Sequence, residues 1–203
     1  MKLSYIEKEV KIKTNIHEQY RHLIVQLQEH NYITYQHSIR VGNLLSLLGL
    51  RLGFSLKKTE TLYIIGILHD IGKIHVPNRI LNKSGKLTLN EWNELQLHPE
   101  YGIKLLKNIP LPSEVLSAIA AHHENLDGSG YPSGLTGDDI PYFAKMTRVV
   151  DSYDAMTYSR PYRKEGMSDE HAIIELKRGI GTFYEKEILD GFCEIIKENG
   201  KTT

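Results

Sequence analysis

The residues best able to do chemistry in this chain are histidines and aspartates, beginning with the adjacent pair His69-Asp70. The pair ends an apolar run and is followed by Gly72 and Lys73. A carboxylate has two oxygens and can bridge two ions, so a metal pair could bind this imidazole and carboxylate together. A helix C-terminus is the alternative for this stretch alone, with Gly72 as its cap and Lys73 on the helix dipole. The rest of the chain has to decide between them.

Histidines recur on the expected inner faces and at the ends of other helices. His37 shares a helical face with Val41 and Leu45, where a lone histidine is more often a hydrogen-bonded core residue than a ligand. His122 and His123 stand side by side at another helix end. Two adjacent histidines there are costly as core filler but ordinary as metal ligands.

Taken jointly, these residues form a set of five histidines and two aspartates from five expected helices. The set is His37, His69, Asp70, His98, His122, His123 and Asp151. Burying all of them without a cation carries a large desolvation cost, which two divalent ions sharing Asp70 would remove. Imidazole and carboxylate donors suit iron or manganese better than magnesium. We therefore expect two divalent metal ions, iron or manganese.

Composition excludes several classes of protein. The chain has 203 residues, with 25 basic and 25 acidic side chains, which argues against a surface that coats a nucleic-acid polymer. The most apolar stretch, residues 44–50, is too short to span a bilayer, and no secretion signal follows Met1. Cys193 is the only cysteine, which favours a reducing compartment. We expect a cytoplasmic protein with neither a membrane nor a nucleic-acid polymer as partner.

Helical periodicity and capping residues account for the chain, and no strand pattern of any length appears. The residues expected to open helices are Thr34, Ser55, Thr88, Ser113 and Ser168. Residues 70–83 and the glycine-rich residues 127–137 are expected to form loops. The predicted fold class is all-α, with a single helical bundle over residues 31–203 and the chemistry between its helices.

Residues 1–30 are predicted to form an N-terminal helical arm. Leu3, Val10 and Ile24 share one heptad position, and Lys13 and His17 interrupt the seam. Such a helix either folds back on its own domain or pairs with a second copy as a homodimer, and the first arrangement is favoured.

The ordered series of motifs resembles the HD-GYP family, a branch of the HD-domain metal-dependent phosphohydrolases. The matching stretches are residues 37–41, 68–77, 81–87, 98–99, 122–124, 127–132, 151–156 and 160–163. They cover the chain from roughly Thr34 to its end. A bare His-Asp pair is a weak signal, whereas the ordered series with Gly130-Tyr131-Pro132 is a very specific one.

The resemblance implies a phosphodiesterase that opens the bacterial second messenger cyclic di-GMP to linear pGpG, which some members convert further to GMP. It implies two metal sites that share one carboxylate. One site would use His37, His69, Asp70 and Asp151, and the other would use Asp70, His98, His122 and His123. A hydroxide bridging the two ions would be the nucleophile.

The resemblance also implies roles around the metals. Lys73 would act with Asp70 in catalysis, contacting the scissile phosphate and stabilising its developing charge. Arg160 and Arg163 match positions that the family uses to hold phosphate and guanine, and Tyr131 would lie at the pocket rim. Asp154 is expected to support a ligand histidine or Lys73.

Two other functions are compatible with parts of the sequence. The chain could be another HD-type phosphohydrolase, acting on hybrid cyclic GMP-AMP, ppGpp or dNTPs, but the intact Gly-Tyr-Pro loop and Arg160 and Arg163 argue against it. It could instead be a catalytically silent module that senses a cyclic dinucleotide or binds a GGDEF-type diguanylate cyclase through that loop. Degenerate family members lose ligands or the lysine, and this chain keeps both.

Three positions depart from the family pattern. Ile33 stands where some members have a glutamate that binds a third metal, so we expect two ions and not three. Asn125-Leu126 replaces the usual Arg-Trp, which should change the pocket wall or a partner surface. Phe183-Tyr184-Glu185 replaces Phe-Asp-Pro, and we expect only a structural effect from it.

Overall fold

The computed structural model describes residues 17–158 and 165–200, which form helices joined by short loops. In these two ranges there is no β-strand, only isolated bridges at Asp127–Thr136 and Ile180–Tyr184, so the predicted all-helical fold is confirmed. The elements are α2 (His17–His30), α3 (Tyr32–Arg51), α4 (Leu56–Leu68), η1 (Ile71–His75), α5 (Asn78–Leu81), α6 (Leu89–Leu95), α7 (His98–Leu106), α8 (Ser113–Ala121), η2 (Gly137–Asp139), α9 (Tyr142–Thr157), α10 (Asp169–Arg178) and α11 (Lys186–Gly200). None of the described helices is long and apolar enough to cross a membrane.

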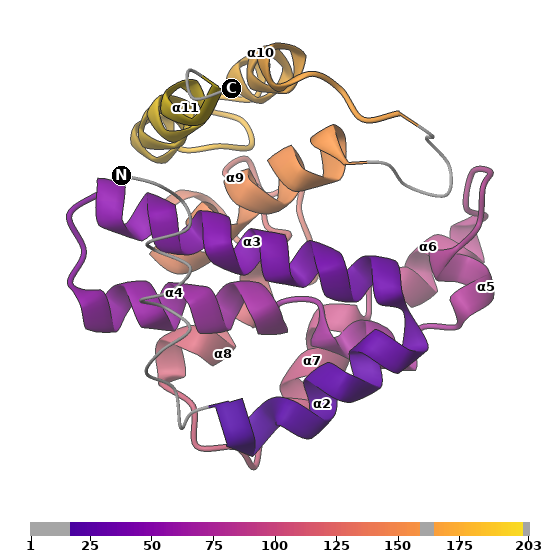
Figure 1. The fold of residues 1–203 in the computed structure, drawn as a ribbon. Helices are drawn as coiled ribbons and strands as arrows, with labels where there is room; N and C mark the ends of the chain where they lie inside the picture. Colours follow the sequence, from indigo (N-terminus) through magenta and orange to yellow (C-terminus); the bar gives the residue numbers. More distant parts are fainter. Residues whose placement is uncertain (1–16, 159–164, 201–203) are drawn as a thin grey trace.

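Helix α3 lies at the centre of the molecule. Figure 1 shows α4 returning alongside it, α9 on its other side, and α10 and α11 covering α9. Gly66 of α4 packs directly on Gly42 of α3, because a Cβ at Gly66 would come within 2.4 Å of the Gly42 Cα. This close approach brings His37 on α3 beside His69 at the end of α4, with ring centroids 5.2 Å apart.

The core between these helices is made of apolar side chains at helical spacing. Leu45 and Leu48 of α3, Leu62 and Ile65 of α4, and Val149 of α9 are fully buried. Burial of each such side chain contributes about 1.5–3 kcal/mol. The core therefore fixes the relative positions of the three helices that carry His37, His69 and Asp151.

Helix α2 contributes to the same core. Its Tyr20, Leu23 and Leu27 are buried, and the helix packs on α3 and η1. Residues 1–16 lie outside the described part of the chain, so only the second half of the predicted arm is seen. The domain boundary at residues 30 and 31 and the homodimer through this helix remain predictions.

Two local predictions were wrong at the corner between α2 and α3 and in the segment that packs on it. Helix α3 begins at Tyr32 and not at Thr34, because the Asn31 side chain accepts a hydrogen bond from the Thr34 N–H and caps the helix. Asn31 also donates hydrogen bonds to Asn78 and Asn82, at 2.9 Å each. Residues 70–83, predicted as loop, contain η1 and α5, and this segment is anchored to the α2–α3 corner by the two asparagines.

Three of the four other capping predictions are confirmed. Ser55, Thr88 and Ser168 cap their helices as predicted, and Thr88 forms a full capping box with Glu91. Ser113 does not cap α8, since it is the first residue of that helix and Pro112 occupies the N-cap position without a side-chain bond. A proline preceding a helix supplies a fixed φ that starts the helix without a capping oxygen.

Candidate metal centre

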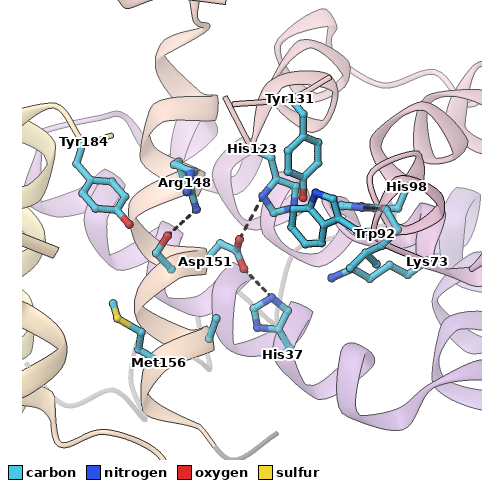
Figure 2. A pocket seen from close by; sticks show the side chains of 13 residues that line it. His37, Lys73, Trp92, His98, His123, Tyr131, Arg148, Asp151, Met156 and Tyr184 are labelled. Carbon is cyan, nitrogen blue, oxygen red and sulfur yellow. Dashed lines mark hydrogen bonds and ion pairs between the residues drawn. The ribbon is translucent and has the colours of Figure 1, made fainter. Parts of the chain in front are cut away.

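The seven candidate ligands come together from five parts of the fold. His37 lies on α3, His69 and Asp70 follow α4, His98 begins α7, His122 and His123 follow α8, and Asp151 lies on α9. Six of them are buried and His123 is half-buried. Figure 2 shows His37, His98, His123 and Asp151 directed into one cavity.

Asp70 joins two groups of donor atoms. The donor atoms of His37, His69 and Asp70 lie within 4.8 Å of one another, and so do those of Asp70, His98, His122 and His123. The Asp70 Oδ2 is 3.6 Å from His37 Nε2 and 3.4 Å from His69 Nε2, whereas its Oδ1 is 3.3 Å from His98 Nε2. Each carboxylate oxygen therefore faces a different group, as a bridge between two ions requires.

Backbone carbonyls fix the orientation of three imidazoles. The Nδ1 atoms of His69, His98 and His122 lie 2.7, 2.8 and 2.7 Å from the carbonyl oxygen three residues earlier. A carbonyl can only accept, so each Nδ1 carries the hydrogen and, in a neutral ring, Nε2 keeps its lone pair. This orientation is the one that a histidine ligand adopts when it binds a metal through Nε2.

The Nε2 atoms of His98 and His122 face each other in a geometry that suits a bound cation. Their Nε2 atoms are 3.2 Å apart, and if both rings are neutral neither has a hydrogen to donate to the other. Burial lowers the pKa of His98 to about 4, and burial also moves the pKa of His122 well below its usual value. Because a proton between them is disfavoured near neutral pH, a metal ion is the partner that fits two converging lone pairs.

Two further observations fit a metal at this place. Among the described residues, His69 Nε2 and Asp70 Oδ1 are buried without a hydrogen-bond partner. Burial disfavours the protonated form of His69, yet the adjacent Asp70 outweighs it and the pKa of His69 is raised. A site that favours positive charge despite complete burial, lined by imidazole and carboxylate donors, could hold metal ions.

Asp151 lies between the two groups and not only in the first. Its Oδ1 is 3.0 Å from His37 Nε2 and 3.9 Å from His69 Nε2. Its Oδ2 is 3.9 Å from His123 Nδ1. Asp151 is thus near both groups, although the family resemblance placed it with His37 and His69 alone.

Asp154 supports His37. Its Oδ2 lies 2.6 Å from His37 Nδ1, and Arg40 holds the carboxylate through Nε–Oδ1 and Nη2–Oδ2 bonds of 2.7 and 2.8 Å. Burial opposes ionisation of Asp154, but His37 and Arg40 outweigh it, so its pKa is lowered. Of the two partners considered for Asp154 from the sequence, the structure has the histidine. Arg40 received no role from the sequence, although it stands three residues after His37.

Lys73 and Tyr131 line the same cavity as His37, His98, His123 and Asp151. The volume of this cavity is about 460 Å³. The Lys73 Nζ is 2.7 Å from Asp70 Oδ2, one turn of η1 past that carboxylate. Tyr131 stacks on His123 with centroids 4.7 Å apart. Arg160 and Arg163 lie outside the described residues.

Buried Glu124 holds the Gly-Tyr-Pro loop in place beside His123. Its carboxylate accepts hydrogen bonds from the backbone N–H groups of Ser133 and Leu135, at 2.7 and 3.1 Å. A Cβ at Gly130 would come within 2.4 Å of the Glu124 Cα, so only glycine allows this approach. The loop thereby presents Tyr131 to the cavity.

Acid should destabilise the metal-free protein. Burial lowers the pKa of His98 from 6.5 to about 4 and also lowers those of His122 and His123, whereas the pKa of His69 shifts upward. Below pH 6.5 the three imidazoles with lowered pKa values bind fewer protons in the folded chain than in the unfolded one, which outweighs the opposite contribution of His69. The free energy of unfolding should therefore fall as the pH drops from 7 toward 4. The decrease should be on the order of 3 kcal/mol from His98 alone.

Urea unfolding of chelator-treated protein at several pH values measures this effect. A free energy of unfolding that stays constant or rises on acidification from pH 7 would contradict the assignment of neutral, buried imidazoles.

The sequence matches the HD domain family over residues 19–188, most of its length. The chain therefore belongs to the HD domain family, and its relatives confirm the recognition of the HD-GYP branch. HD-domain phosphohydrolases depend on metals, and the cluster around Asp70 agrees with that property.

The relatives include enzymes named for two cyclic dinucleotides. A cyclic di-GMP phosphodiesterase of Pseudomonas aeruginosa is 38% identical over 174 residues, which cover 85% of this chain and 42% of that protein. The 3′3′-cGAMP-specific phosphodiesterase 1 of Vibrio cholerae is 40% identical over 130 residues, which cover 64% of this chain and 30% of that protein. The chain thus spans less than half the length of these curated relatives.

A solved structure shares the fold. Bd1817, an HDGYP protein of Bdellovibrio bacteriovorus, superposes with a TM-score of 0.65 at 23% identity, covering 79% of this chain and 51% of that one.

Proposed function

We propose that residues 31–203 form the catalytic domain of a metal-dependent phosphodiesterase that hydrolyses cyclic di-GMP to linear pGpG, with GMP as a further product to be tested. The observation that carries the proposal is the sharing of Asp70 between two groups of donor atoms at one wall of a cavity. The names of the relatives support the choice of substrate.

Two divalent ions, iron or manganese, would be held by the two groups of donors. His37, His69, Asp70 and Asp151 would hold the first, and Asp70, His98, His122 and His123 the second. Such ions lower the pKa of bound water and so supply a nucleophile for phosphodiester hydrolysis near neutral pH. The carbonyl bonds to Nδ1 of three histidines support these assignments, because they leave Nε2 as the donor.

The side chains around the ions would bind and orient the substrate. Lys73 would contact the scissile phosphate, where its ammonium group can stabilise charge that develops in the transition state. Tyr131 would bound the pocket from the Gly-Tyr-Pro loop, and Asp154 would keep His37 in its ligating orientation.

Metal analysis of protein purified without oxygen, in parallel with a cyclic di-GMP turnover assay, tests the proposal. We expect two ions per chain, because seven donors are present and Ile33, a third of whose surface is exposed, offers no donor for a third ion. Anomalous diffraction gives an independent count. Three stoichiometric ions, or metal-loaded protein without turnover, would contradict the proposal.

Arg160 and Arg163 are proposed to hold phosphate and a guanine edge. Replacing both by alanine should raise the Michaelis constant for cyclic di-GMP strongly. Hydrolysis of bis-p-nitrophenyl phosphate should change much less, since that diester offers no guanine and no second phosphate. Steady-state kinetics on both substrates measures the difference. A parallel loss on both would mean that these arginines support the fold or the metal centre.

Hybrid cyclic GMP-AMP is the second candidate substrate. The observation in its favour is the relative in Vibrio cholerae that is named for that molecule and is 40% identical to this chain. Competition between the two cyclic dinucleotides in one assay decides which has the higher kcat/KM.

The proposal also covers the protein partners and the cellular compartment. A GGDEF-type diguanylate cyclase would dock on the Gly-Tyr-Pro loop, and the N-terminal helix would mediate a homodimer if one forms. We place the protein in the cytoplasm, because its single cysteine, Cys193, is buried as a free thiol and no disulfide is needed.

A further inference from the structure

A second permanent cation faces the cavity from α9. Arg148 lies one helical turn before Asp151, and among the described residues that line the cavity only Arg148 and Lys73 carry a fixed positive charge. Figure 2 shows the two on opposite sides of Asp151 and His123. A ligand that spans this distance could be held at both ends.

Neutral groups hold the Arg148 side chain in place. Its Nε donates to Asn125 Oδ1 at 3.0 Å, and its Nη1 donates to Ser152 Oγ at 2.8 Å. The Tyr184 ring centroid lies 5.7 Å from the guanidinium carbon. No carboxylate in the described ranges forms an ion pair with Arg148, so its charge is positioned but not neutralised within this part of the chain. An oriented, half-buried cation of this kind favours an anionic ligand.

Asn125 connects this cation to the Gly-Tyr-Pro loop. The residue is buried, and its Nδ2 donates to Ser129 Oγ at 3.0 Å while its Oδ1 accepts from Arg148. Asn125 is one of the positions that depart from the family pattern. Its neutral amide supplies an acceptor and no charge, so Arg148 brings the positive charge to this wall from α9 instead.

We propose that Arg148 binds the second phosphate of the cyclic dinucleotide, the one that is not being hydrolysed; this inference rests on the proposed function. The substrate carries two phosphates in one ring, so when one lies beside Lys73 the other must face a different wall. Nη2 of Arg148 donates to no described residue and is available for an anionic oxygen. A guanine edge takes two parallel donors, and the single Nε–H of Arg148 already donates to Asn125, so the bidentate face formed by Nε and Nη2 is not available to it.

Three variants of the full chain test the proposal. Arg148→Met removes the charge and keeps an unbranched side chain. Asn125→Asp keeps the acceptor for Nε but pairs a carboxylate with Arg148, which cancels the charge without removing the arginine. Arg178→Met is the matched control, because Arg178 is an exposed residue of α10 and its loss changes the net charge equally.

Michaelis constants for cyclic di-GMP and for guanylyl-(3′→5′)-guanosine, which has one phosphate, are the readout. Arg148→Met should raise the constant for cyclic di-GMP by about tenfold to a hundredfold, the effect of losing one charge-assisted hydrogen bond. Asn125→Asp should act in the same direction, and Arg178→Met should match the wild type. The change for the single-phosphate dinucleotide should be much smaller, and kcat should change less than the Michaelis constant.

Every other outcome contradicts the proposed role of Arg148 or the proposed function. An unchanged constant for cyclic di-GMP in Arg148→Met or in Asn125→Asp overturns the role of Arg148. An equal rise for both dinucleotides shows that Arg148 contacts a group they share, guanine or the hydrolysed phosphate, and not the second phosphate. A parallel loss on bis-p-nitrophenyl phosphate shows that it supports the metal centre. Absence of cyclic di-GMP turnover in metal-loaded wild-type protein contradicts the proposed function itself, and with it this inference.

Discussion

Replacing Asp70 by alanine should remove both metal ions and abolish hydrolysis of cyclic di-GMP. One oxygen of Asp70 faces His37 and His69, and the other faces His98, so the variant removes a donor from both groups at once. It also removes the negative charge that would lie between two cations. Metal content by atomic emission and turnover in the same preparation measure the effect.

The control for this variant is Asp138→Ala, which removes a carboxylate that is fully exposed on η2. It should retain two ions and wild-type turnover. Two tightly bound ions in Asp70→Ala would show that the bridge has been assigned to the wrong residue.

Lys73→Ala should retain the metal ions and lose activity by roughly a hundredfold to a thousandfold, the usual effect of removing one transition-state donor. Lys73 is a cation 2.7 Å from Asp70, so its removal takes a positive charge away from the site and should not weaken the binding of cations. Metal content and kcat, measured together, separate this result from that of Asp70→Ala.

Lys104→Ala, at an exposed position of α7, is the matched control and should behave as wild type. Wild-type rates in Lys73→Ala would instead identify Lys73 as a lysine that only complements the end of a helix.

Residue types and their order were enough to predict the all-helical fold and the family, both of which are confirmed. The seven candidate ligands could be grouped from the sequence because each stands at an inner face or helix end, where periodicity is informative. Their convergence in the structure agrees with that grouping. The roles of the individual residues remain predictions.

The side-chain contacts that orient the candidate ligands could not be predicted from the sequence. Arg40 reaches Asp154, and Asn125 reaches Arg148, only because α3 and the loop after α8 pack against α9. Pairings of this kind depend on helix crossing geometry, which no local spacing encodes. The wrong start of α3 has a similar cause, since the capping asparagine also bonds to two side chains of a segment predicted as loop.

The contact between His37 and Asp154 joins residues 117 positions apart in the chain. An ion held by His37, His69, Asp70 and Asp151 would act in the same region as a cross-link between α3 and α9. Closing so long a loop is entropically unfavourable in the unfolded chain, and contacts of such high sequence separation tend to form late in folding. Metal binding would then raise the free energy of unfolding as well as supply chemistry, because the ions bind the folded chain and not the unfolded one.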